Sequence, residues 1–147
     1  MKIKEKPKKV TGVLTLDVYR NGVLISSDTG ENLVVDGGLD ALAGAMVGTP
    51  NKNITKFLAG TDNTAVTAAD TALGAEEFDK VIDTVTPGAT GVMVIEFSMS
   101  ALEGNGFTYT EWGLECADGT LFSHKTATPI VKDTTITIAG AWTITIS

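Results

Sequence analysis

The sequence predicts a mainly β protein, an antiparallel β-sandwich or flattened barrel that carries one short α-helix. Several segments alternate apolar and polar side chains with the period of two that a half-buried strand requires. Asn21-Gly22 and Asp118-Gly119 each separate two such segments, as tight hairpin turns do. We therefore expect one β domain over residues 10–147, preceded by a flexible basic arm over residues 1–9.

Length and composition are those of a globular domain. The 147 residues are 43% hydrophobic and 20% charged, which favours a packed core over a disordered chain. The single cysteine, Cys116, has no second cysteine for an internal disulfide, so the chain is compatible with a reducing cytoplasm. No apolar run approaches the ~18 residues of a membrane helix, and none follows the first lysines as in a signal peptide. We expect neither membrane contact nor export by that route.

Charge is distributed unevenly along the chain. Residues 1–9 hold five lysines and one glutamate, and the remainder holds 6 basic and 17 acidic residues, a net charge of −11. The arm predicts a contact with an acidic neighbour, and the alternative is a solvated tail. An acidic body repels phosphates, so we expect no nucleic-acid partner. The residues predicted to bind the partner are Lys2, Lys4, Lys6, Lys8 and Lys9.

The first part of the domain predicts a hairpin and a further short strand. Residues 10–18 alternate, and an Asn-Gly turn leads into a second strand at residues 23–26. Asp28-Thr29-Gly30 predicts a loop, because these residue types favour turns, and residues 32–35 form the next strand.

Residues 39–47 predict the one helix. Leu39, Leu42, Ala43 and Met46 recur at helical spacing, and Gly48 with Pro50 ends the segment. Gly44 lowers the helix propensity by ~1 kcal/mol relative to alanine, so packing on a sheet must hold the helix in place. A small residue there also allows close approach.

A strand at residues 54–60 is followed by residues 61–74, which show neither period and predict a long surface loop. Such a loop is a candidate contact surface, and the alternative is a loop that merely crosses the end of the sheets. Asp62, Asn63 and Asp70 carry oxygen ligands, but their spacing differs from that of an EF-hand, so we expect no metal.

Three later segments predict strands, two before the hairpin at Asp118 and one after it. Residues 78–86 form one strand, and residues 91–102 form the clearest long strand. Residues 136–147 predict a final half-buried strand with a bulge at Gly140. The predicted core consists of Leu14, Leu16, Met93, Ile95, Phe97, Trp112, Leu114, Ile136, Trp142 and Ile144.

The Asp118-Gly119 hairpin predicts a type I′ turn, in which both central residues have positive φ. Its incoming strand places Trp112, Leu114 and Cys116 on one face and Glu111, Gly113 and Glu115 on the other. Leu121 and Phe122 are adjacent on the return strand, so one of them faces outward or meets a bulge. A partner surface is the candidate cover for that outward residue.

The residues that carry catalytic chemistry are few, and we predict no enzyme and no cofactor. His124 has no acidic neighbour in the sequence to orient it, which leaves only a carboxylate from elsewhere in the chain. Cys116 shares its face with Trp112 and Leu114, which predicts a buried and unreactive thiol. The carboxylates at Glu76, Glu77 and Asp79 are typical of a solvated strand start rather than of a glycosidase pair.

A series of short motifs recurs along the chain in a characteristic order. They are residues 32–39 (NLVVDGGL), 57–61 (FLAGT), 69–73 (ADTAL), 105–106 (NG), 111–114 (EWGL), 118–122 (DGTLF) and 142–144 (WTI). In this order the chain resembles small structural proteins of tailed bacteriophages that are often described as tail-fibre-like. The resemblance covers most of the chain after residue 30.

The resemblance implies a non-enzymatic virion component, assembled in the host cytoplasm, such as a connector, collar or tip protein. It implies action through oligomerisation, with a homotrimer expected, and through attachment to other virion proteins. A capsid decoration protein is an alternative. A carbohydrate-binding β-sandwich that recognises a host-surface glycan is another, although Trp112 and Trp142 both fall in the core phase.

Overall fold

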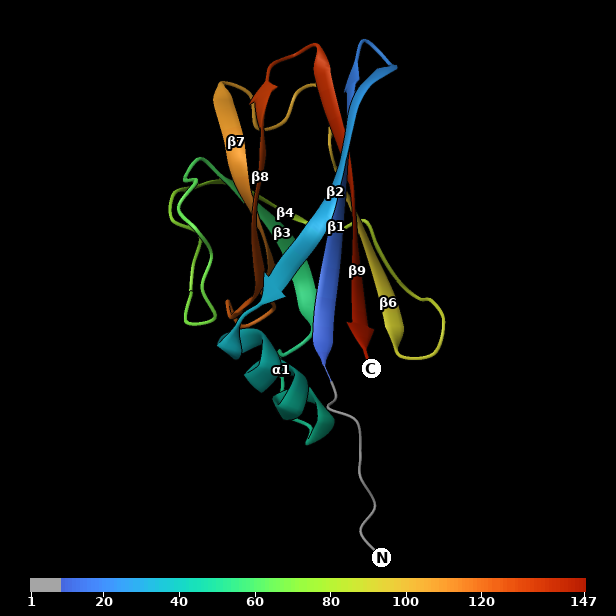
Figure 1. Cartoon of the computed structure of the whole chain (residues 1–147), viewed down its shortest axis with the longest axis vertical. Coiled ribbons are helices and arrows are strands. Elements are labelled where there is room, and N and C mark those ends of the chain that lie inside the picture. The colour runs from blue at the N-terminus through green and yellow to red at the C-terminus, as the bar shows by residue number, and fades with distance from the viewer. Residues whose placement is uncertain (1–8) are drawn as a thin grey trace, which may run out of the picture.

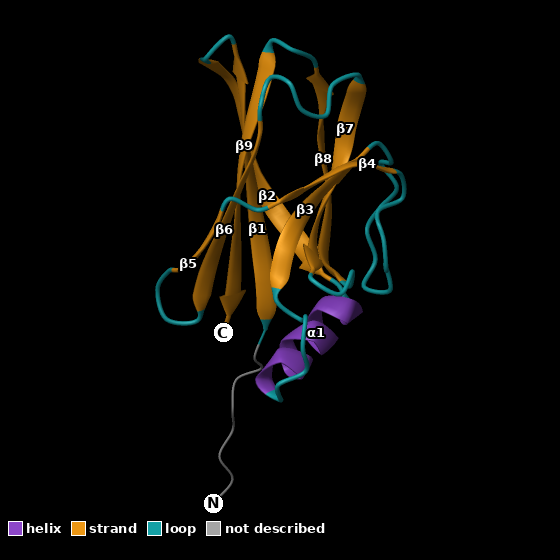
Figure 2. Ribbon diagram, turned by 180° about the vertical axis from the view of Figure 1, so that it is seen from behind, coloured by secondary structure: helices purple, strands orange, loops and turns teal. Residues whose placement is uncertain are grey.

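The computed structural model describes residues 9–147 and shows nine antiparallel strands and one helix, as the sequence predicts. The strands form one curled sheet in the order β4-β3-β7-β8-β2-β1-β9-β6-β5, with α1 at one end (Figures 1 and 2). The elements are β1 (Val10–Arg20), β2 (Val23–Val34), α1 (Asp36–Met46), β3 (Ile54–Gly60), β4 (Glu76–Val81), β5 (Thr84–Pro87), β6 (Val92–Met99), β7 (Phe107–Cys116), β8 (Leu121–Lys132) and β9 (Ile136–Ile146).

The curled sheet has two halves that face each other across the core. Strands β2, β1, β9, β6 and β5 form one half, and β4, β3, β7 and β8 form the other. Only Leu33 with His124 and Val34 with Ser123 pair across the junction between β2 and β8. The arrangement is therefore close to a sandwich that is joined along one short seam.

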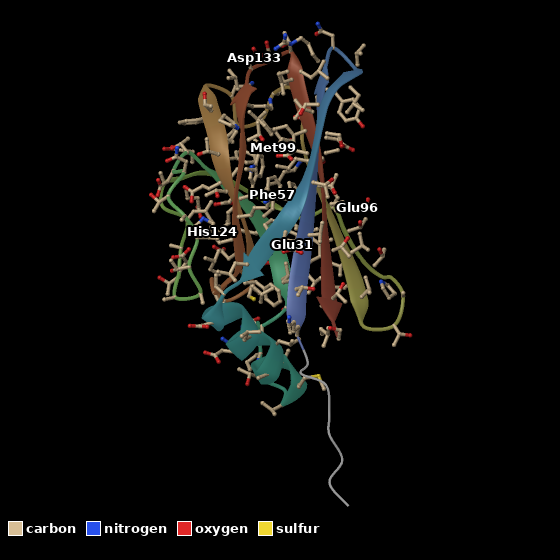
Figure 3. All side chains as sticks on the ribbon, in the orientation of Figure 1. Glu31, Phe57, Glu96, Met99, His124 and Asp133 are labelled. Carbon is tan, nitrogen blue, oxygen red and sulfur yellow. The ribbon has the colours of Figure 1, made fainter. Side chains whose placement is uncertain are left out.

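Aromatic side chains fill the space between the halves (Figure 3). Phe57 stacks on Phe97 with ring centroids 4.3 Å apart, and Trp112 and Trp142 flank Phe97. Nine of the ten predicted core residues are buried, and Met93 is partly buried against the same core. The alternation of side chains in the sequence thus identified the inner face of the strands correctly.

Gly140 has a different role from the one predicted. The pairing of β9 with β1 and β6 continues through Gly140 without a bulge. A Cβ atom at this position would lie 2.1 Å from Cζ of Phe97. Glycine is required there because the phenyl ring of Phe97 lies against the backbone of β9.

The hairpin of β1 and β2 has the predicted two-residue turn, because Asn21 and Gly22 have φ values of 48° and 82°. The predicted loop at Asp28-Thr29-Gly30 is wrong, since these residues continue β2 and pair with β1. Backbone hydrogen bonds to a long neighbouring strand outweigh the turn preference of the three side chains.

The hairpin of β7 and β8 is not the predicted type I′ turn. Gly119 has a φ of 90°, whereas Asp118 is not left-handed. The amide of Gly119 donates to the carbonyl of Cys116 (2.9 Å), and the amide of Cys116 donates to the carbonyl of Thr120 (2.9 Å), which closes a three-residue turn. Lys52 holds this turn through its ammonium group, 2.6 Å from the carboxylate of Asp118.

Helix α1 begins three residues before its predicted start and approaches β8 through Gly38. A Cβ atom at Gly38 would lie 2.1 Å from the carbonyl oxygen of Phe122, whereas one at Gly44 would have ordinary contacts. The close approach thus occurs at Gly38 rather than at the predicted Gly44. The predicted strand over residues 78–86 is divided into β4 and β5, with Ile82 and Asp83 between them.

Candidate functional site

The loop over residues 61–75 is packed against the outer face of β3, β7 and β8 instead of crossing the end of the sheets. Its side chain Leu73 is buried with Val35, Leu58 and Leu121 in a second, smaller apolar cluster. A Cβ atom at Gly113 would lie 2.6 Å from Cδ1 of Leu73, so glycine makes room for the loop. Leu121 is therefore covered by this loop and not by the partner surface predicted from the sequence.

Glu111 anchors the loop from beneath. The sequence places it on the outer face of β7, yet the loop covers it and leaves 1% of the residue exposed. Its carboxylate accepts hydrogen bonds from the backbone amides of Asp62 (3.0 Å), Gly74 (2.8 Å) and Ala75 (2.8 Å). A buried carboxylate with several N–H donors is well satisfied, so Glu111 acts as a fixed acceptor around which the loop folds.

His124, labelled in Figure 3, lies on the side of the sheet that carries the loop. Two carboxylates contact its ring. Its Nδ1 is 2.9 Å from Oδ2 of Asp70, and its Nε2 is 2.9 Å from Oε1 of Glu111. Carboxylates only accept hydrogen bonds, so the imidazole satisfies both when each ring nitrogen carries a proton. Through these two contacts, the cluster ties Asp70 of the loop to Glu111 of β7 and His124 of β8.

His124 has no acidic neighbour in the sequence, and the two carboxylates beside it in the fold come from Asp70 and Glu111, 54 and 13 residues away. Sequence spacing gives no sign of Asp70, because only the path of the loop brings it to β8. The amide of Thr67 and the side chain of His124 lower the pKa of Asp70 by hydrogen bonding, despite partial desolvation. This aspartate is therefore held in its charged form beside the ring.

The oxygen ligands that the sequence offered for calcium do not converge. Asp62 directs one carboxylate oxygen to the amide and hydroxyl of Thr64, and these bonds lower its pKa. Asp70 binds Thr67 and His124. Within residues 9–147 there is no group of three or more histidine, cysteine or acidic side chains placed to hold a metal ion.

Two other sequence candidates are placed clearly by the structure. Cys116 is buried, as predicted, and burial raises the pKa of its thiol to about 11. Glu76 and Glu77 are exposed at the start of β4 as predicted, although partial desolvation and the charge of Asp79 raise the pKa of Glu76.

The predicted partner-binding lysines fall largely outside the structure. Lys2, Lys4, Lys6 and Lys8 lie outside the described residues. Lys9 is exposed, and its backbone pairs with that of Ser147 through bonds of 2.8 and 2.9 Å. The described chain therefore begins next to the last strand, at the end of the domain that carries α1 (Figure 1).

An uncovered opening lies between β2 and β8. The two strands diverge from their seam toward the end of the molecule opposite α1 (Figure 1). In the described chain, residues 23–32 of β2 have β1 as their one strand neighbour, so their other edge is unpaired. A groove of about 230 Å³ follows this opening, lined by Val18, Arg20, Ile25, Pro129, Ile130 and Ile136.

The edge of this opening exposes apolar side chains. Val23 is 66% exposed, and Leu24 and Ile25 are each half-exposed beside it. Lower in the opening, Nζ of Lys125 donates to the carbonyl of Glu31 (3.0 Å) and bridges the strands near the seam. At residues 23–25, the far end of the free edge, unpaired backbone groups occur together with exposed apolar side chains, which is the type of surface that accepts another strand.

Comparisons with protein-family models, with curated proteins and with solved structures found no significant match to this chain. The helix in the described part of the chain is too short to cross a membrane.

Proposed function

We propose that the chain is a non-enzymatic structural component of a tailed-phage virion, which acts by oligomerisation and by attachment to neighbouring particle proteins. The observation that carries the proposal is the free edge of β2, with its apolar side chains and the groove beside it. Natural sheet proteins usually cover, charge or interrupt such an edge, so the exposed and uncharged stretch at residues 23–25 favours a role in assembly. The motif order described above adds the tailed-phage context.

The His124 cluster supports the same proposal. A histidine in an enzyme needs a ring nitrogen that faces substrate, whereas both nitrogens here face carboxylates. The cluster instead fixes a 15-residue stretch, residues 61–75, on the sheet. A rigid outer surface suits a subunit whose contacts must form in one geometry.

The carbohydrate-binding alternative has less support. Binding modules of this kind hold sugar rings on exposed aromatic side chains, whereas Trp112, Trp142 and Tyr109 are fully buried. Phe107, at the end opposite α1, is the one large aromatic side chain in the described chain that is exposed. A single partly exposed phenyl ring offers little platform for a glycan.

The test is to raise an antibody against the purified chain and to label phage particles from a lysate of the host strain that carries its coding sequence. The proposal expects label at a fixed position on the tail, the collar or the capsid, and the position would also distinguish an appendage from a decoration protein. Particles that remain unlabelled, while the free chain is detected in the same lysate, would contradict a virion role. Binding of the free chain to host-surface glycans would then favour the alternative.

A further inference from the structure

Helix α1 has two apolar faces, and only one of them packs on the domain. The inner face includes Gly38 and Ala41, which are buried, and Leu42, which is partly buried. The second face consists of Leu39, Ala43, Met46 and the following Val47, at spacings of four, three and one residues. Leu39 is 44% exposed, and Met46 and Val47 are each 82% exposed.

A helix with apolar side chains on two faces is normally covered on both. The need for a cover is stronger here because the intrinsic stability of α1 is low. It contains three glycines, its N-terminal residue makes no side-chain capping bond, and its last turn carries no basic residue. Packing must therefore supply most of its stability.

An apolar pocket opens at the same end of the molecule, beside the uncovered helix face. Its volume is about 370 Å³, and it lies between α1, the start of β3, and strands β5 and β6. Its apolar lining includes Leu42, Ala45, Ile54, Val85, Met93 and Phe122. The ion pair of Lys52 with Asp118 lies at its polar edge.

We propose that this end of the molecule docks on a second copy of the chain, with Met46 of one copy inserted into the pocket of the other. Ala45 lines the pocket, yet Met46, the next residue, points into solvent instead of filling it. The same surface thus holds both a protruding apolar side chain and a hollow of the same character. Such a surface is self-complementary and can be paired by a symmetry axis.

The Met46 side chain and the lining of the pocket are both apolar. Methionine is flexible and fills irregular apolar cavities well. The lining of the pocket is mostly apolar, and the Lys52–Asp118 pair lies at its edge, as in interfaces with an apolar core and a polar rim. The patch is small beside the ~800 Å² per partner of a standard interface, so association should depend strongly on concentration.

The effect of salt concentration distinguishes this contact from one made by the basic arm. Each copy carries a net charge of −7, so two copies repel each other, and salt screens that repulsion while it leaves the apolar contact intact. Self-association through α1 should therefore strengthen as salt is raised. Attachment of the arm lysines to an acidic surface should weaken under the same change.

The inference rests on the oligomerisation in the proposed function and names the surface that makes it. The experiment is sedimentation equilibrium of the full chain over about two decades of concentration around the micromolar range, at low and high salt. We expect the 15.3 kDa chain to form a dimer or a trimer, more completely at high salt. Met46→Glu should remain monomeric at every concentration.

Two further variants keep the test decisive. Leu102→Glu changes a side chain that is 86% exposed in the loop between β6 and β7, at the opposite end, and should associate like the wild type. Ala45→Phe fills the pocket, retains Met46, and should also lose association. All three positions are exposed, so the melting temperature of each monomer should stay close to that of the wild type.

Two results would overturn the inference. One is a wild-type chain that stays monomeric over the whole range, which would assign the helix face to a different particle protein. The other is an oligomer that persists in Met46→Glu, which would assign self-association to another surface. Either result leaves the antibody test of the virion role unaffected.

Discussion

Single buried residues determine how the strands pack and how the loop over residues 61–75 is held on the sheet. Glu111 is the clearest case, because one carboxylate accepts three backbone amides and a ring nitrogen of His124. Glu111→Gln keeps the shape of the side chain but replaces one acceptor oxygen with an NH2 group. This NH2 group is itself a donor and would face the N–H donors that the carboxylate now binds. We expect a loss of roughly 1–3 kcal/mol in the free energy of unfolding, because buried donors lose their acceptor.

The measurement for Glu111→Gln is chemical denaturation together with amide hydrogen exchange, in which Gly74 and Ala75 should lose protection first. Glu96→Gln, on the exposed side of β6, serves as the matched control and should behave like the wild type. A loop whose amides remain protected in Glu111→Gln would mean that the apolar contacts of Leu73 hold it without the carboxylate.

A second prediction concerns Gly140, where the backbone of β9 lies against the ring of Phe97. Gly140→Ala adds a Cβ atom that would lie 2.1 Å from the ring of Phe97, so the ring or the strand must shift. We expect a destabilisation of about 1–3 kcal/mol, measured by denaturant unfolding. Adding Phe97→Leu removes the obstructing ring atoms, so Gly140→Ala should cost less in that background than in the wild type. A cost that is equal in both backgrounds would show that Phe97 is not the reason for the glycine.

At the scale of elements, the hairpin of β7 and β8 depends on a charged turn. The Lys52 side chain, followed by Thr120, lowers the pKa of Asp118 to about 2 from its ordinary 3.8. A carboxyl whose pKa is lowered by folding stabilises the folded chain above its ordinary pKa, and this contribution disappears as pH falls toward 2. Because the pair is exposed, its effect should be small.

We therefore expect Asp118→Asn to lower the melting temperature at neutral pH and to have little effect near pH 2. Melting curves of the wild type and the variant at a series of pH values measure the difference directly. Lys52→Gln should lose part of the same pH-dependent stability. A difference that stays constant with pH would mean that the asparagine acts through the turn backbone and not through the charge.

The elements also show how far the sequence alone could lead. Alternation identified the core face of β1, β6, β7 and β9, because each has one buried face and a period of two. It could not identify β2 as one long strand, since Asp28-Thr29-Gly30 has the composition of a turn and only the ladder to β1 overrides it. The His124 cluster could not be predicted either, because Asp70 is 54 residues from His124 in the sequence and lies in a loop without a hydrophobic period.

In the whole molecule, the face of the sheet that the loop covers and the two exposed apolar surfaces lie in different places. The loop over residues 61–75 seals the outer face of β3, β7 and β8. The free edge of β2 lies at one end of the sandwich and the exposed face of α1 at the other (Figure 1). Under the proposed function, one of these surfaces would contact a copy of the chain and the other a neighbouring particle protein.

The proposed role of the β2 edge can be tested by measuring how much of the chain is incorporated into phage particles when this edge is charged. Leu24→Lys combined with Ile25→Lys changes two half-exposed side chains, so the fold should melt as the wild type does. Lysine on an edge strand opposes pairing with another strand. Val81→Lys, on β4 at the far end of the strand order, is the matched control.

We expect incorporation of the double variant to fall by about tenfold or more, which corresponds to ~1.4 kcal/mol of lost contact energy, while Val81→Lys is incorporated normally. Incorporation is measured by quantitative immunoblot of purified particles against a major capsid band. If particles took up the double variant as fully as the wild type, the β2 edge would not be the attachment surface, and the central claim would be contradicted.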